Sequence, residues 1–378
     1  MKVLFVAGPS SATLFALTPL AQAVRSAGHE VIMATTEEMV PVAERLAIPF
    51  VTVTDRTLAG LLTTDRTGAV LPLPQTLAEH RRFAGGWFAR LAAYTLDDLL
   101  ELTRHWRPDL VVGGTSAYVT GLLSAHLGVP HVRQTWDTLR TGEVIDRHAD
   151  EELAPELAPL GLKELPRPDL FLDVCPPSLR APEDLGAPGI RWVPGNMQRK
   201  LEPWMLTRAD RPRVCVTSGS RVAVTESQEF LRNLARSVRD LDVEIVVPAP
   251  EEVAGELRAT VPDVRTGWIP LDVLAPTCDV ILHHGGGVTA MTALHAGVPQ
   301  LVLPSFPTFG DSWARLADSG AAEVLMPQEQ SEASVIDACR RLLTRPEYRE
   351  RAAGLSREIG AMPGPAAYVA RLEGLAAR

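Results

Sequence analysis

The chain has 378 residues and a formal net charge of −9, and 46% of its residues are apolar. Its length exceeds that of a typical single domain and fits two domains. The acidic balance argues against nucleic acid or an anionic membrane surface as the main partner, because both attract basic patches. No apolar run in the sequence approaches the length that spans a membrane.

The four cysteines, Cys175, Cys215, Cys278 and Cys339, include no C-x-x-C pair. This pattern favours buried thiols in a reducing compartment over a disulfide framework or a zinc site. The N-terminus has some features of a signal peptide, but Gly8-Pro9-Ser10-Ser11 interrupts its apolar run after Val3–Ala7. We therefore expect a strand, a loop and a helix there, and a cytoplasmic protein.

Short apolar runs alternate with helical patterns along the first half of the chain. The predicted strands are Val3–Ala7, Val31–Ala34, Phe50–Val53, Leu110–Val112 and His131–Arg133, and the predicted helices are Ala12–Ala27, Glu38–Leu46, Leu77–Trp106 and Ala117–Leu127. This alternation predicts an α/β domain with a parallel sheet covered by helices on both faces. Such sheets bind ligands beyond the C-terminal ends of their strands, so Ser10 and Thr115 are candidate binding residues.

Pro and Gly become dense from Ala154 to Pro212, where no strong helix is predicted beyond Asp150–Leu157. Alternation then restarts. The strands expected after this point are Val214–Thr217, Val243–Val247, Val264–Thr266, Val280–Leu282, Leu301–Leu303 and Glu323–Leu325. We therefore predict two doubly wound domains, residues 1–200 and 213–360, joined by a linker at 201–212. Residues 361–378 form a helix that packs back on the N-terminal domain.

A Gly-rich turn links the predicted strand Val280–Leu282 to a helix at Thr289–His295. Its sequence is His283-His284-Gly285-Gly286-Gly287-Val288-Thr289. Such a turn directs backbone N–H groups outward, and the helix N-terminus adds positive potential. The pattern predicts a site for a phosphate or diphosphate. The alternative is a tight turn with buried polar histidines.

Four segments in one order carry a family resemblance: Trp268-Ile269-Pro270, His283–Thr289, Ala296–Pro304 and Gly320-Ala321-Ala322. Together they resemble the donor-binding signature of family 1 glycosyltransferases of the GT-B fold. More narrowly, the chain is similar to antibiotic-tailoring enzymes of actinomycetes, above all the urdamycin-type C-olivosyltransferases of the angucycline pathways. The segments that carry this narrower likeness are Gly113-Gly114-Thr115, Arg133–Asp137, Leu201–Met205 and Val216–Arg221.

The resemblance implies that the second domain binds a dTDP-sugar and the first an acceptor. The residues implied at the diphosphate are Ser218, Gly219, Ser220, Arg221, His283, Gly286, Gly287, Val288 and Thr289. Those at the nucleobase are Trp268, which stacks on the ring, and Ile269, whose backbone pairs with its edge. Arg221 is equally compatible with a solvated charge at a helix start. For Trp268 stacking is favoured, and the alternative is a partly buried aromatic at the domain edge.

Two departures from the family pattern bear on the chemistry. Thr13 occupies the position where many relatives have a catalytic histidine, and a threonine hydroxyl is no general base near neutral pH. Asp137 is then the favoured candidate base, and the alternative is a carboxylate that caps a helix or bonds to N–H groups of its loop. Thr308-Phe309 replaces a sugar-binding Asp-Gln pair, which predicts a deoxysugar with fewer hydroxyls to hold. We expect Thr13, Thr308, Phe309 and Asp311 to contact that sugar.

The acceptor site is less sharply indicated. Phe83 and Trp87, in a segment with two glycines, either line a flat polyketide site or belong to a kinked helix in the core. The long loop Thr54–Pro74 is a candidate lid.

These patterns predict an inverting, metal-independent glycosyltransferase without a cofactor. Its partners are a dTDP-2,6-dideoxyhexose such as olivose and an aromatic polyketide acceptor, with C-glycosylation favoured. O-glycosylation, a nucleotide-sugar epimerase and a non-catalytic partner of another glycosyltransferase are the alternatives. A homodimer is compatible with the sequence.

Overall fold

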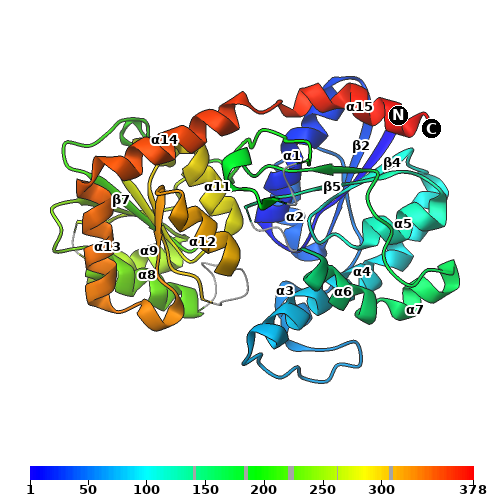
Figure 1. The fold of residues 1–378 in the computed structure, drawn as a ribbon, viewed down its shortest axis with the longest axis horizontal. Helices are drawn as coiled ribbons and strands as arrows, with labels where there is room; N and C mark the ends of the chain where they lie inside the picture. Colours follow the sequence, from blue (N-terminus) through cyan, green and yellow to red (C-terminus); the bar gives the residue numbers. More distant parts are fainter. Residues whose placement is uncertain (139–141, 183–185, 220–224, 262, 306–309) are drawn as a thin grey trace.

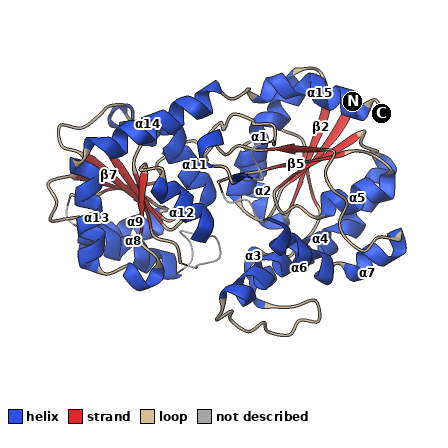
Figure 2. Ribbon diagram, in the orientation of Figure 1, coloured by secondary structure: helices blue, strands red, loops and turns tan. Residues whose placement is uncertain are grey.

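The computed structural model describes residues 1–138, 142–182, 186–219, 225–261, 263–305 and 310–378. Two six-stranded sheets, each entirely parallel, form the centres of two halves (Figure 1 and Figure 2). The first has the order β3-β2-β1-β4-β5-β6, and the second has the order β12-β11-β10-β7-β8-β9. Both orders are those of a doubly wound sheet, which confirms the predicted α/β fold class.

The strands are short and mostly buried, as parallel strands covered on both faces must be. Those of the first sheet are β1 (Lys2–Val6), β2 (Glu30–Thr35), β3 (Phe50–Thr52), β4 (Leu110–Gly114), β5 (His131–Gln134) and β6 (Leu170–Leu172). Those of the second are β7 (Arg213–Thr217), β8 (Glu244–Pro248), β9 (Arg265–Gly267), β10 (Val280–His283), β11 (Gln300–Val302) and β12 (Ala322–Val324). Most lie within one or two residues of the predicted runs.

Helices cover both faces of each sheet. In the first half they are α1 (Ser11–Ser26), α2 (Val40–Ala43), α3 (Leu58–Thr63), α4 (Leu77–His105), α5 (Val119–Leu127), α6 (Gly142–Glu152) and α7 (Ala154–Leu157). In the second they are α8 (Thr225–Ser237), α9 (Glu251–Thr260), α10 (Leu271–Leu274), α11 (Gly287–Ala296), α12 (Gly310–Asp318), α13 (Glu332–Thr344) and α14 (Pro346–Ala361). The last helix, α15 (Val369–Ala376), returns to the first half. No helix in these described stretches is both long and apolar enough to cross a membrane.

Helix α4 runs without interruption through the two glycines that were weighed as a kink. A Cβ atom built on Gly85 would lie 2.5 Å from the backbone oxygen of Ile145 and 2.9 Å from Cβ of His148, both in α6. The glycine therefore permits close packing of two helices rather than breaking one. Helix α6 was not predicted except where its end overlaps the expected helix Asp150–Leu157, and strand β6 lies in the Pro-rich stretch that was treated as loop.

The C-terminal segment joins the two halves. Helix α14 lies along the second half, and α15 lies beside the first sheet, close to the N-terminus (Figure 1). His29 Nε2 is 2.8 Å from Glu373 Oε1, and the Tyr368 hydroxyl donates to the Gly189 carbonyl at 2.7 Å. One cluster of buried apolar residues runs from β1 and α1 through α15 and α14 to α11. The halves thus share packed apolar surface, not only a linker.

One buried histidine makes folding sensitive to acid. His131, at the start of β5, is 1% exposed, and neither ring nitrogen has a hydrogen-bond partner among the described residues. Burial lowers the pKa of His131 to about 4, although Asp169 opposes the shift. The unfolded chain takes up a proton near pH 6.5 that the folded chain refuses until about pH 4. The free energy of unfolding is therefore not reduced by His131 above pH 6.5, and it falls as the pH drops from about 6.5 to about 4.

We predict that wild-type protein loses more unfolding free energy between pH 7 and pH 5 than His131→Leu does, by about 2 kcal/mol. Urea unfolding at the two pH values measures the difference. His126→Leu, at an exposed position in α5, is the control and should keep the wild-type pH dependence. Equal losses in wild type and His131→Leu would contradict the assignment.

Candidate functional site

The loop after β5 in the first half lies directly on the first turn of α11 in the second half. Asp137, three residues beyond the end of β5, is 6% exposed. A Cβ atom built on Gly287 would lie 2.2 Å from Oδ2 of Asp137 and 2.3 Å from its Cβ. Helix α11 lies on the side of the second sheet that faces the first (Figure 1). The candidate base and the expected diphosphate turn therefore meet at the junction of the two halves.

The N-terminus of α11 has the form of an anion site. Gly286 is the N-cap residue and, being glycine, offers no side chain of its own to cap the helix. The first backbone N–H groups, those of Gly287, Val288 and Thr289, have no partner within the helix and carry its positive potential. The turn depends on Gly285, whose φ of 84° lies in the left-handed region that favours glycine.

His283 holds this turn from within the domain. It is 0% exposed, and its Nε2 lies 2.9 Å from Oε1 of Gln300 on the neighbouring strand β11. Its Nδ1 accepts the backbone N–H of Gly285 at 3.2 Å. Burial lowers the pKa of His283 to about 4, so the ring is neutral near pH 7. The expectation that His283 donates to a diphosphate is corrected, because both ring nitrogens are engaged and the ring is shut off from solvent.

His284 lies at the turn instead, and the residue-level prediction omitted it. A Cβ atom on Gly286 would lie 2.8 Å from Cε1 of His284, and one on Gly219 would lie 3.3 Å from the same atom. Oγ1 of Thr289 is 3.0 Å from the same built position on Gly219. Strand β7 is paired with β10, which brings its C-terminal end beside the turn. Residues from the ends of β7 and β10 and from the first turn of α11 thus lie together at this turn: Gly219, His284, Gly286 and Thr289.

Ser218 adds a second indication of a ligand at this place. It follows β7 directly and is 0% exposed. Its hydroxyl has no hydrogen-bond partner in the part of the chain that the structure describes. A buried polar atom without a partner is costly unless something else satisfies it. Ser220 and Arg221, the other residues expected here, lie outside the described residues.

Trp268 presents a ring to solvent at the edge of the second half. It is 41% exposed, and its indole N–H donates to the Met197 carbonyl at 2.8 Å. Arg199 Nη1 donates to the Trp268 carbonyl at 2.9 Å. The segment that precedes the expected linker thus fixes Trp268, whose side chain remains partly exposed. The adjacent Ile269 side chain is 6% exposed and packs in the core.

The expected sugar residues are only partly placed. Asp311 is exposed in the first turn of α12, whereas Thr308 and Phe309 lie outside the described residues. Thr13, in the first turn of α1, is 8% exposed, and its hydroxyl is 2.7 Å from the Ser10 carbonyl and 3.0 Å from that of Gly8. Ser10 is the N-cap residue of α1 and accepts the Thr13 N–H. Both side chains therefore help to shape the loop after β1.

Aromatic rings connect α4 to the candidate base. The ring centroids of Trp87 and Phe88 are 3.6 Å apart, and those of Phe88 and Trp136 are 5.9 Å apart. Trp136 precedes Asp137 and fits against Gly114, where a Cβ atom would lie 2.2 Å from Cζ3 of the indole.

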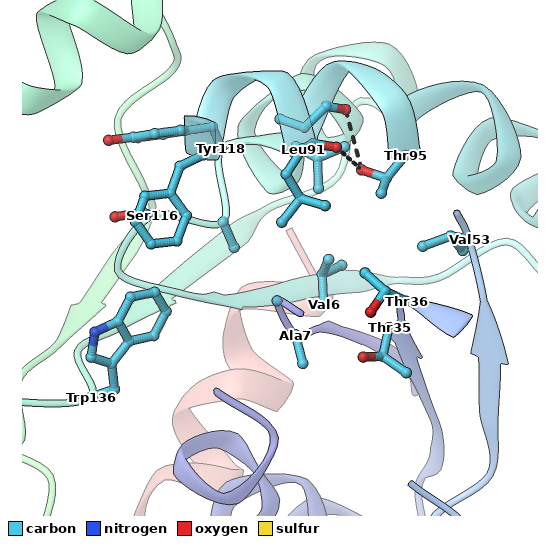
Figure 3. Close-up of a pocket in the computed structure, with 15 residues that line it drawn as sticks. Val6, Ala7, Thr35, Thr36, Val53, Leu91, Thr95, Ser116, Tyr118 and Trp136 are labelled. Carbon is cyan, nitrogen blue, oxygen red and sulfur yellow. Dashed lines mark hydrogen bonds between the residues drawn. The ribbon is translucent and has the colours of Figure 1, made fainter. Parts of the chain in front are cut away.

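A cavity lies beside these rings (Figure 3). Phe88 and Trp136 line it together with apolar residues and with Thr35, Thr36 and Ser116, whose buried hydroxyls have no partner among the described residues. Its volume is about 20 Å³, close to the space of one water molecule. Thr115 is 1% exposed and directly precedes the lining residue Ser116 in sequence. Phe83 lies one helical turn before Trp87 in α4.

Comparison with known sequences identifies the family. Residues 22–219 match the N-terminal domain and residues 232–375 the C-terminal domain of the family described as erythromycin biosynthesis protein CIII-like. The chain belongs to this family of glycosyltransferases. Two relatives that span its length are an L-demethylnoviosyl transferase of Streptomyces niveus and a tylactone mycaminosyltransferase of Streptomyces fradiae. The first is 32% identical in an alignment that covers 100% of this chain and 98% of the relative. The second is 31% identical and covers 100% of this chain and 93% of the relative.

Comparison of folds agrees. The glycosyltransferase SsfS6 of Streptomyces sp. SF2575, solved in complex with thymidine diphosphate, aligns with a TM-score of 0.87 and 33% identity over 99% of both chains. The fold is therefore GT-B. These findings favour glycosyl transfer over the epimerase alternative.

We predict that His283→Ala destabilises the protein by about 2–4 kcal/mol, because it removes a buried ring and leaves Gln300 and the Gly285 N–H without their partner. Urea unfolding at pH 7 measures this loss. His126→Ala should change stability by no more than about 0.5 kcal/mol. Unchanged stability combined with lost thymidine diphosphate binding would restore His283 as a direct ligand.

Proposed function

We propose that this enzyme is an inverting glycosyltransferase of antibiotic tailoring, which moves a 2,6-dideoxyhexose such as olivose from dTDP to an aromatic polyketide. The observation that carries the proposal is the contact of Asp137 with the first turn of α11. It places a carboxylate from one half against an anion site of the other. A base for the acceptor and a cradle for the leaving group are thereby adjacent.

The two halves divide the work. We assign acceptor binding to residues 1–200 and donor binding to 213–360, with a linker at 201–212 and a C-terminal helix at 361–378 that returns to the first half. The contact between Nε2 of His29 and Oε1 of Glu373 supports this last assignment. The similarity to a tylactone mycaminosyltransferase and an L-demethylnoviosyl transferase supports a sugar transferred to a natural product.

The diphosphate lies at the N-terminus of α11 in this proposal. Backbone N–H groups of Gly287 and Val288, the Thr289 hydroxyl and the His284 ring stabilise the negative charge that develops on the leaving dTDP. Ser218, Gly219, Ser220 and Arg221 complete the site from the end of β7. Trp268 stacks on the thymine, and the solved complex of SsfS6 with thymidine diphosphate supports this nucleotide.

Asp137 acts as the general base. It removes the proton of a phenol on the acceptor while the ring attacks the anomeric carbon from the face opposite the diphosphate. The bond from that carbon to the diphosphate oxygen breaks, and its electron pair leaves with dTDP. Attack through oxygen gives an O-glycoside directly. Attack through an ortho or para carbon gives a C-glycoside once that carbon loses its proton and the ring regains aromaticity.

C-glycosylation of urdamycin type is the finer proposal, and O-transfer is its alternative. A phenolate has carbanion character at its ortho and para carbons, so a carboxylate base suffices for C–C bond formation. The aromatic series Trp87–Phe88–Trp136 beside Asp137 supports a flat acceptor. Because the neighbouring cavity is so small, such an acceptor lies against these rings rather than within it. Phe309 and Thr308, with Asp311 and Thr13, provide few polar contacts for the sugar, which supports a deoxyhexose.

Incubation with a dTDP-2,6-dideoxyhexose and an angucyclinone-type phenol should give a glycoside that survives mild acid, as detected by mass spectrometry. Asp137→Asn should lower its rate of formation by at least about 100-fold, because an amide cannot accept the proton. Asp242→Asn, an exposed position, should be unaffected. Release of free sugar by acid would establish O-transfer, and no product with any phenol would overturn the proposal.

A second prediction concerns the nucleobase. Trp268→Ala should weaken thymidine diphosphate binding about tenfold or more, because base–aromatic stacking contributes roughly 1–3 kcal/mol. Isothermal titration calorimetry measures the dissociation constant. Trp268→Phe keeps a ring face but loses the hydrogen bond to Met197, so it should retain most of the affinity. Equal affinities of wild type and Trp268→Ala would contradict stacking.

A further inference from the structure

We propose that Gly287 is a positioning residue for Asp137. Its missing side chain sets how closely the loop after β5 approaches the first turn of α11, and therefore where the base lies relative to the leaving diphosphate. The inference rests on the proposed function for its catalytic consequence. The contact itself is a property of the fold.

A side chain at position 287 cannot be accommodated by rotation of neighbouring side chains alone. A Cβ atom on Gly287 would lie 2.2 Å from Oδ2, 2.6 Å from Cγ and 2.3 Å from Cβ of Asp137. Real Cβ atoms essentially never lie within 3.0 Å of another heavy atom, and ordinary contact begins at 3.4 Å. Rotation of the Asp137 side chain moves its carboxylate but not its Cβ. An alanine at 287 must therefore displace the backbone of one segment by about 1 Å.

The backbone of Gly287 does not itself require glycine. Gly285 and Gly219 have positive φ angles, whereas Gly287 does not and is the first residue of α11. Alanine is a better helix former than glycine at such a position. The turn, its N–H groups and His283 can thus remain in place in Gly287→Ala. This substitution separates the approach of Asp137 from the formation of the diphosphate site.

A displacement of this size matters for proton transfer more than for donor binding. A base must lie within hydrogen-bond reach of the proton that it accepts. A misplacement of 1 Å can lower a rate about 100-fold. In the proposed function, by contrast, thymidine diphosphate is held by backbone groups of the turn and by Trp268, not by the Asp137 carboxylate. Substitution of Gly287 should therefore lower kcat and leave the affinity for thymidine diphosphate nearly unchanged.

The first test measures kcat and thymidine diphosphate affinity in Gly287→Ala. We expect kcat to fall by at least tenfold while the dissociation constant changes less than threefold. Gly255→Ala, in α9, is the matched control, because a Cβ atom there meets nothing within 4 Å. It should keep wild-type values of both. An unchanged kcat overturns the inference while the proposed function stands. Loss of nucleotide binding also overturns it, because Gly287 would then serve the turn.

A second test is independent of activity. Gly287→Ala should lower the melting temperature in the wild-type background but much less in the Asp137→Gly background, where the opposing Cβ and carboxylate are absent. Non-additive shifts of this kind report direct contact between two positions. Additive shifts overturn the inference whatever the activity. Absence of transfer by the wild-type enzyme overturns the proposed function, and the melting shifts still decide whether the contact exists.

Discussion

The candidate site depends on the turn between β10 and α11, which the buried His283 holds in place. His283 accepts the Gly285 N–H and bonds to Gln300 of the next strand, and so it fixes the path of the chain from β10 into α11. The helix that results begins after a glycine N-cap, which has no side chain of its own to cap it. Its first backbone N–H groups have no partner within the helix, and the positive potential at this end favours a bound anion without any bound cation.

The second element of the account is the meeting of two chain halves at that turn. Asp137 belongs to the first sheet's loops, yet it touches the helix that the second sheet carries. The apolar cluster that runs from β1 through α15 to α11 also packs the two halves against each other. Such a junction suits a group transfer between two substrates, since each half can bind one and neither site is complete alone.

The sequence predicted both sheets because each strand is a compact apolar run between turn residues. Strand β6 is only three residues long and lies in a Pro-rich stretch, so local pattern gave it no signal. The anion turn was also predictable from its glycines. Which of two adjacent histidines faces it was not, because the burial of His283 depends on Gln300, a residue 17 positions away on another strand.

Contacts between segments far apart in the sequence were the least predictable part of the structure. Nothing near Gly287 in sequence reveals Asp137, and nothing near Gly85 reveals Ile145 in α6. The sequence analysis weighed Gly85 as part of a helix kink and Gly287 as part of an anion-binding turn, whereas in the structure both permit close approach of another segment. Family resemblance identified the donor signature, but the relatives in hand support the glycosyltransferase family and not the urdamycin-type subgroup.

The most direct measurement is a crystal structure of the enzyme with thymidine diphosphate and a phenolic acceptor. The account predicts the diphosphate at the first turn of α11 and the Asp137 carboxylate within about 3.2 Å of the phenol oxygen. A diphosphate bound away from α11, or a phenol oxygen facing a different base with Asp137 turned away, would contradict it.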